Sequence, residues 1–216
     1  MKVSVSITKV KKDRKETILE LNNTDCDYIH VDTMDGNFVK EKQLSYEEFN
    51  EINEYNKKPL DVHLMVDNPS KYIINFKNLN TSIITIHSEI NKNINDLIDL
   101  IHSYKIKAGI SINPNTPVKN IEKYLKKVDN VLIMSVEPGL GGQTFMDNIL
   151  PKINELISLR KKNNYNYLIS IDGGINNETI KKVSDVDMVI SGSYICLSDN
   201  MQEKINSLRF EVKNNE

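Results

Sequence analysis

Short runs of apolar, mostly β-branched residues alternate along the whole chain with longer stretches of amphipathic periodicity. The short runs predict strands, and the longer stretches, in which apolar residues recur every three or four positions, predict helices. The stretch 91–104 shows the helical pattern well, because Ile94, Leu97, Ile98 and Ile101 form one apolar stripe. The chain is therefore predicted to alternate between strand and helix from end to end.

The periodicity predicts eight strand–helix pairs joined by short connections. The predicted strands are 2–7, 27–32, 59–65, 82–87, 107–112, 129–134, 167–172 and 187–191. The predicted helices are 12–22, 45–57, 69–77, 91–104, 117–126, 147–163, 176–183 and 199–212. Eight such pairs in 216 residues predict a (β/α)8 barrel, an α/β TIM barrel, and no linker or composition shift divides it, so 1–216 is expected to be one domain. An open doubly wound sheet is the alternative, but the strands are alike in character and none has the pattern of an edge.

Composition and charge narrow the classes of function. The 28 basic and 30 acidic residues give a net charge of −2. The chain therefore lacks the excess of basic residues that is typical of proteins that bind nucleic acids or membrane surfaces. No apolar run approaches the roughly 20 residues that span a bilayer, and the first residues lack the pattern of a secretory signal. Cys26 and Cys196 are isolated, and a reduced cytoplasmic protein is a better interpretation than a disulfide.

Histidines and carboxylates occur at the predicted strand ends. His30 and Asp32 stand two residues apart on one strand and share a face, and His63 lies on the next strand. Asp172 ends a later strand and is a candidate fourth ligand. These N and O donors suit Zn²⁺, with Mn²⁺ and Fe²⁺ as alternatives. Each residue alone fits a core histidine or a helix-capping aspartate, but four at matching strand ends favour a divalent metal site.

Three glycine-containing segments follow the sixth, seventh and eighth predicted strands. Their relevant residues are Gly139, Gly141, Gly142, Gly173, Gly174, Gly192 and Ser193. In barrels of this kind, the loops after the seventh and eighth strands bind phosphate through backbone amides. Each segment alone fits a simple turn, but their joint placement predicts a phosphorylated substrate.

Several other residues at strand ends have two interpretations. Met34, Met65 and Met134 are either core filler or an apolar wall of the site. Glu89, two residues after His87, is expected to be an exposed carboxylate at a helix start, with support of the site as the alternative.

Eight segments of the chain, taken in this order, resemble the ribulose-phosphate 3-epimerase family. They are 5–7, 30–39, 61–66 with Pro69, 84–89, 113–117, 134–145, 172–175 and 191–193. The resemblance implies a ribulose-phosphate-binding type of (β/α)8 barrel and an isomerase of carbohydrate metabolism. Its reaction would be the interconversion of D-ribulose 5-phosphate and D-xylulose 5-phosphate in the pentose phosphate pathway.

The resemblance also implies roles for individual residues. His30, Asp32, His63 and Asp172 would bind one divalent metal ion per subunit, with zinc expected and iron, manganese or cobalt as alternatives. Asp32 and Asp172 would be the two acid/base groups, one on each side of a planar enediolate. The implied substrate-binding residues are Ser6, His63, Met34, Met65, Met134, Gly139, Gly141, Gly142, Gly173, Gly174, Gly192 and Ser193. A small-molecule ketose phosphate is the expected partner, and a homo-oligomer is expected.

The sequence also departs from the family pattern near the site. Val5 stands where proline is usual, Thr8 begins a changed segment after the first strand, and Lys40-Glu41 replaces a Pro-Asn pair. Leu140 stands where phenylalanine is usual. None of these changes removes a proposed ligand or base. The rival functions are another ketose-phosphate 3-epimerase, such as one acting on allulose 6-phosphate, and a non-catalytic sugar-phosphate-binding barrel, which has no need of two bases.

Overall fold

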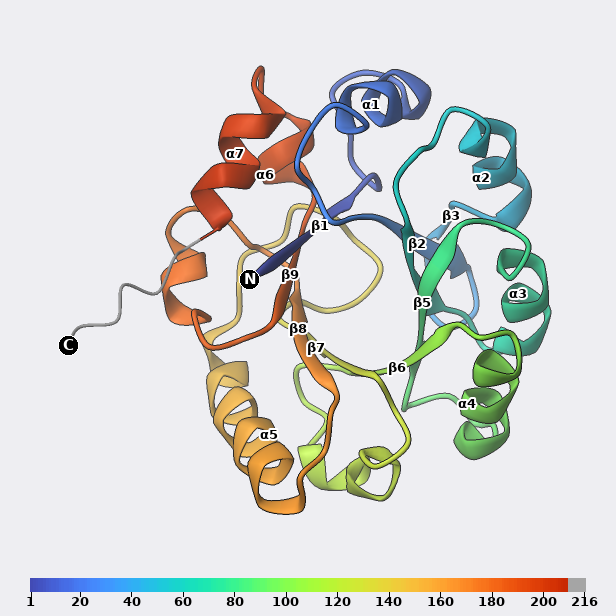
Figure 1. The fold of residues 1–216 in the computed structure, drawn as a ribbon, viewed down its shortest axis with the longest axis vertical. Helices are drawn as coiled ribbons and strands as arrows, with labels where there is room; N and C mark the ends of the chain where they lie inside the picture. The colour runs from blue at the N-terminus through green and yellow to red at the C-terminus, as the bar shows by residue number, and fades with distance from the viewer. Residues whose placement is uncertain (210–216) are drawn as a thin grey trace.

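A closed barrel of parallel strands forms the centre of the computed structural model, which describes residues 1–209 (Figure 1). The barrel strands are β1 (Lys2–Ser6), β2 (Tyr28–Asp35), β4 (Leu60–Met65), β5 (Thr81–His87), β6 (Lys107–Ile112), β7 (Asn130–Met134), β8 (Leu168–Asp172) and β9 (Met188–Ser191). Neighbours pair in the order β1-β9-β8-β7-β6-β5-β4-β2, and β1 pairs with β2 to close the ring. The predicted TIM barrel is therefore confirmed, and the open sheet is wrong.

Helices surround the barrel and cover its outer face (Figure 1). They are α1 (Arg14–Leu21), α2 (Tyr46–Asn53), α3 (Pro69–Phe76), α4 (Ile94–Ser103), α5 (Leu150–Asn163), α6 (Ser193–Cys196) and α7 (Met201–Leu208). All four residues of the predicted apolar stripe of α4 are buried. Ser45 and Glu48 form a reciprocal capping box that fixes the start of α2. Within residues 1–209, no helix has the length and apolar character needed to cross a membrane.

The structure differs from the predicted elements in three places, besides the short helix α6, which was not predicted. The segment predicted as a helix at 117–126 forms two 3-10 turns, Val118–Asn120 and Glu122–Tyr124. Its buried residues recur at a spacing of three, which matches the 3-10 repeat. The 176–183 helix is a 3-10 segment, Thr179–Lys182. A short unpredicted strand, β3 (Lys42–Gln43), pairs antiparallel with the end of β2. Positions 210–212 of the last predicted helix lie outside the described residues.

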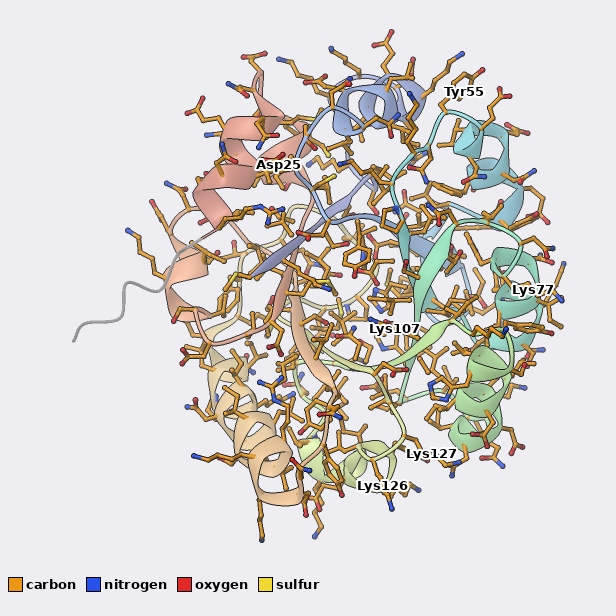
Figure 2. The ribbon with its side chains drawn as sticks, viewed as in Figure 1. Asp25, Tyr55, Lys77, Lys107, Lys126 and Lys127 are labelled. Carbon is orange, nitrogen blue, oxygen red and sulfur yellow. The ribbon has the colours of Figure 1, made fainter. Side chains whose placement is uncertain are left out.

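Alternate residues of each strand point into the barrel, where side chains fill the enclosed space (Figure 2). Part of this interior is a separate apolar cluster that includes Leu132, Met134 and Ile190. Lys107, at the start of β6, and Lys127, before β7, mark the N-terminal ends of the strands. The polar residues singled out in the sequence lie at the opposite, C-terminal ends.

Candidate metal centre and active site

Four side chains from three strands converge at the C-terminal end of the barrel. His30 and Asp32 come from β2, His63 from β4 and Asp172 from β8. Strands β2 and β4 are neighbours, with Asp32 in register with His63, whereas β8 lies elsewhere in the ring. One ligand atom from each residue lies within 4.8 Å of all the others. The structure therefore brings together the four residues predicted to hold a metal ion.

The converging atoms are two ring nitrogens and two carboxylate oxygens. Asp32 Oδ1 lies 3.1 Å from His30 Nε2 and 3.2 Å from His63 Nδ1. Asp172 Oδ2 lies 4.0 Å from His30 Nε2 and 3.8 Å from His63 Nδ1. Both histidines are fully buried, and the Asp172 side chain is 16% exposed. A set of two N and two O donors at this spacing fits a divalent transition ion.

A buried carboxylate fixes the orientation of His30. Its Nδ1 lies 2.7 Å from Oδ2 of Asp61, and the same oxygen accepts a hydrogen bond from Ser4 Oγ at 3.0 Å. Because a carboxylate only accepts, Nδ1–H of His30 donates to Asp61, and Nε2 faces the site and Asp32. Sequence reasoning missed Asp61. The signal was present, because Asp61 is a charged residue two positions before His63 on the same face of an apolar strand.

His63 is oriented by a second chain of contacts, through His87 and Glu89. His63 Nε2 lies 2.9 Å from His87 Nε2, and His87 Nδ1 lies 3.1 Å from Glu89 Oε2. Burial lowers the pKa of His87 to about 4 against the opposing influence of Glu89, so its ring is neutral. Burial opposes charge on Glu89, but hydrogen bonds from His87, Asn113 and Thr116 lower the pKa of Glu89 to about 2.

The prediction for Glu89 as a carboxylate at a helix start was wrong. The residue is exposed as a whole, but its side chain is only 22% exposed because the carboxylate faces His87. Helix α4 begins five residues later, at Ile94, and Asn93 is its N-cap. The alternative weighed for Glu89, support of the site, agrees with these contacts.

The second oxygen of Asp32 is held by two hydroxyl groups. Ser6 Oγ and Thr8 Oγ1 each donate to Asp32 Oδ2 at 2.7 Å. Thr8 belongs to the segment that departs from the family pattern, and its contact with Asp32 was not predicted. Asp32 is therefore contacted on both oxygens.

The two aspartates have opposite electrostatic character. Burial opposes charge on Asp32, but His30 and the hydrogen bonds from both histidines hold the pKa of Asp32 well below its usual value. Burial raises the pKa of Asp172 to about 7, and the negative charge of Asp32 adds to this shift. Burial also opposes charge on His30, but Asp32 and Asp61 outweigh it and raise the pKa of His30. Two nearby carboxyl groups with separated pKa values are typical of an acid/base pair.

A cavity of about 550 Å³ opens above these residues. Its volume is in the range of small-molecule sites. All but one of the predicted substrate-binding residues line it, together with both aspartates: Ser6, Asp32, Met34, Met65, Met134, Gly139, Gly141, Gly142, Asp172, Gly173, Gly174, Gly192 and Ser193. The exception is His63, which with His30 lies beneath the cavity floor. Lys9, Asn176 and Lys182 also line the cavity and were not predicted.

Comparison with known proteins identifies the family. Residues 2–196 match the Ribulose-phosphate 3 epimerase family over nearly the whole chain. The chain belongs to this family. A ribulose-phosphate 3-epimerase from Helicobacter pylori is 39% identical over 188 residues, which cover 86% of this chain and 87% of that protein. Another, from Bacillus subtilis, is 35% identical over 194 residues and 88% of each chain.

A tryptophan synthase structure from Mycobacterium tuberculosis has the same fold, with a TM-score of 0.71 at 10% identity over 97% of this chain and 93% of that one. At this identity the likeness shows the fold alone. Membership of the ribulose-phosphate 3-epimerase family confirms the resemblance seen in the sequence and the predicted class of enzyme, an isomerase.

Proposed function

We propose that this epimerase interconverts D-ribulose 5-phosphate and D-xylulose 5-phosphate by moving a proton at C3 between two carboxyl groups. The observation that carries the proposal is the convergence of Asp32, from β2, and Asp172, from β8, at the floor of one cavity. The family of the chain and the names of its relatives support this substrate pair.

The donor set supports a bound divalent ion, held by His30, Asp32, His63 and Asp172. Both histidines are hydrogen-bonded at the nitrogen that faces away from the site, and the other nitrogen of each faces Asp32, where a metal ion would take the place of the proton. Zinc is the expected ion, with iron, manganese and cobalt as alternatives. When bound, the ion would supply Lewis-acid stabilisation of the oxyanion that forms next to the reacting carbon.

The aspartates would carry the proton. Asp32 is ionised and can remove the C3 proton on its face of the substrate, while Asp172, with a pKa of about 7, can deliver a proton to the opposite face. In the reverse direction the roles exchange. Ser6 and Thr8 hold Asp32 in place during the transfer. Because both groups act on one planar enediolate, the substrate does not need to turn over.

Other residues would bind and shield the substrate. Met34, Met65 and Met134 are nearly fully buried at the cavity floor, where they would exclude water from the enediolate. The backbone amides of Gly173, Gly174 and the Gly192-Ser193 turn would hold the phosphate, since they follow the paired strands β8 and β9. The cytoplasmic location and the homo-oligomer stay predictions.

A coupled assay tests the metal and the substrate together. Ribulose 5-phosphate and allulose 6-phosphate are each assayed before chelation, after chelation and after zinc is added back. We expect activity on ribulose 5-phosphate that chelation removes and zinc restores. Full activity in stripped protein, with its metal content measured, would refute the role of the ion, and preference for the six-carbon substrate would refute the substrate assignment.

The Asp172→Asn variant tests the two carboxyl groups. Loss of one acid/base group is expected to reduce epimerisation by about 10²–10⁴-fold with the fold retained. In D2O, this variant should still exchange the C3 proton of the one epimer whose C3 proton faces Asp32. The Asp32→Asn variant should exchange the C3 proton of the other epimer. Asp185→Asn, at an exposed position, is the control. Near-normal turnover in metal-loaded Asp172→Asn would overturn the assignment.

A further inference from the structure

The contacts around His63 form a directed chain of hydrogen bonds that ends at Glu89. We infer that Glu89 and His87 are positioning residues which set the tautomer of His63 and leave its Nδ1 free to bind a metal ion. This inference rests on the proposed metal site and concerns residues outside its ligand set.

The direction of the chain is set at Glu89. Its Oε1 accepts the backbone N–H of Asn113 at 2.8 Å and the hydroxyl of Thr116 at 2.5 Å. Its Oε2 faces His87 Nδ1 at 3.1 Å. An ionised carboxylate only accepts hydrogen bonds, so Nδ1 of His87 must carry the proton. The His87 tautomer that this carboxylate selects has its one proton on Nδ1 and a lone pair on Nε2.

The same logic then determines which ring nitrogen of His63 carries a proton. Two ring nitrogens, His87 Nε2 and His63 Nε2, lie 2.9 Å apart, and one of them must be the donor. Because His87 Nε2 carries no proton, His63 Nε2–H donates. With a metal ion in place of the 3.2 Å contact between His63 Nδ1 and Asp32 Oδ1, the one proton of His63 would stay on Nε2, and Nδ1, which faces Asp32 and Asp172, would supply the lone pair for the ion. A nitrogen that carries a proton cannot bind a metal ion, so reversal of the chain would disable this ligand.

The far end of the chain is held in place by neighbouring elements. Lys152 of α5 donates to the carbonyl groups of Asn113, Pro114 and Thr116, at 2.7 to 2.8 Å. These contacts hold the loop that supplies both donors to Glu89. The ring of Phe38 packs on His87 with a centroid distance of 4.6 Å. The position of Glu89 Oε1 is therefore determined by structure outside the metal centre.

This geometry makes Glu89→Gln a sharp test. With its carbonyl oxygen at the Oε1 position, a glutamine would present an NH2 group to His87 Nδ1. That group is a donor, so it would favour hydrogen bonds that run the other way, from His87 Nε2–H to His63 Nε2. Turned the other way, its NH2 group would face the N–H of Asn113. When a metal ion occupies His63 Nδ1, each arrangement places two hydrogen-bond donors against each other. The expected loss of zinc affinity is about 10–100-fold.

Asp61→Asn is the matched variant on the other histidine. Both donors to Asp61, His30 Nδ1–H and Ser4 Oγ–H, reach the same oxygen, Oδ2. An asparagine carbonyl can accept both, so His30 keeps its tautomer although a negative charge is lost. Glu155→Gln, at an exposed position on α5, controls for loss of charge near Lys152.

The experiment measures zinc affinity by chelator competition and histidine tautomers by long-range ¹H–¹⁵N spectra of the zinc-loaded protein. In the unmodified protein we expect protons on His63 Nε2 and His87 Nδ1. Glu89→Gln should bind zinc about 10–100-fold more weakly, Asp61→Asn should keep the His30 Nδ1–H tautomer, and Glu155→Gln should bind as the unmodified protein does.

Four outcomes would each overturn a claim, and they are distinguishable. Zinc affinity of Glu89→Gln equal to that of the unmodified protein, or a proton on Nε2 of His87, overturns the inference alone. Failure of the unmodified protein to bind zinc overturns the proposed metal site. If Glu89→Gln does not fold, His87→Gln and His87→Leu provide the test, because only a glutamine can accept from His63. Equal zinc affinity of those two variants would also overturn the inference.

Discussion

The turn after β8 permits a stability prediction at Gly174, one of the expected phosphate-binding residues. Gly174 has a φ of +63°, and a Cβ atom added there would lie 2.5 Å from the backbone nitrogen of Phe145 and 2.9 Å from its Cα. An alanine in the left-handed region costs about 1–2 kcal/mol. The overlap is with backbone, which cannot rotate away, and crowding of this kind costs about 1–3 kcal/mol. Gly174→Ala should therefore lower the free energy of unfolding by roughly 2–5 kcal/mol.

A second glycine of the same cavity is the matched control. A Cβ on Gly141 would lie 3.6 Å from Lys9 Cβ and 3.8 Å from Thr8 Cγ2, which are ordinary contact distances. Gly141→Ala should therefore change stability by less than about 0.5 kcal/mol.

Urea and thermal unfolding of metal-stripped protein measure both variants. Gly174→Ala should lower Tm by on the order of 10 °C. Its KM for ribulose 5-phosphate should rise, because Gly174 and Phe145 both line the cavity. Equal stability of Gly174→Ala and Gly141→Ala would refute this account of the turn.

Two further predictions concern single side chains. Thr8 donates to the ionised form of Asp32, so Thr8→Val should raise the pKa of Asp32 and move the acid limb of the kcat/KM profile to higher pH, whereas Thr8→Ser should leave it in place. A hydrogen bond to a charged group contributes about 1.5 kcal/mol, so activity on the acid limb should fall roughly tenfold, and an unmoved limb would contradict this role. Burial raises the pKa of Cys196 to about 12 and also raises that of Cys26, so neither thiol should react with a disulfide reagent in folded protein at pH 8, and both should react in urea. Rapid labelling of the folded chain would contradict the burial of these two free thiols.

Periodicity in the sequence was sufficient to predict the barrel, because the strands are short apolar runs buried on both faces and the long helices bury one face. The stripe of α4 and the continuous apolar run of β7 are examples. The elements that were predicted wrongly or not at all are too short for a hydrophobic pattern to identify them. Strand β3 has two residues, and the 3-10 segment Val118–Asn120 has three, which is too few to show a repeat within the element itself.

Polar residues at strand ends were sufficient to predict the four converging side chains, because burial of His30, Asp32, His63 and Asp172 needs a functional reason. Their supporting partners were harder to predict. Asp61 reaches His30 only because β2 and β4 are neighbours in a particular register, and Glu89 is held by a loop that follows another strand. Such contacts depend on how strands align in space, which the spacing of residues along the chain does not determine.

The site is asymmetric, and the asymmetry suits a reaction that runs in both directions. Asp32 is held by Ser6, Thr8 and both histidines, which stabilise its charged form. Within residues 1–209 the Asp172 carboxylate accepts no hydrogen bond, and burial brings its pKa to about 7. A rigid, ionised base on one wall thus faces a carboxyl group on the other that can hold or release a proton near neutral pH. A bound cation would lower both pKa values, but the difference in hydrogen bonding would remain, since it is set by β1 and its following loop on one side and by β8 on the other.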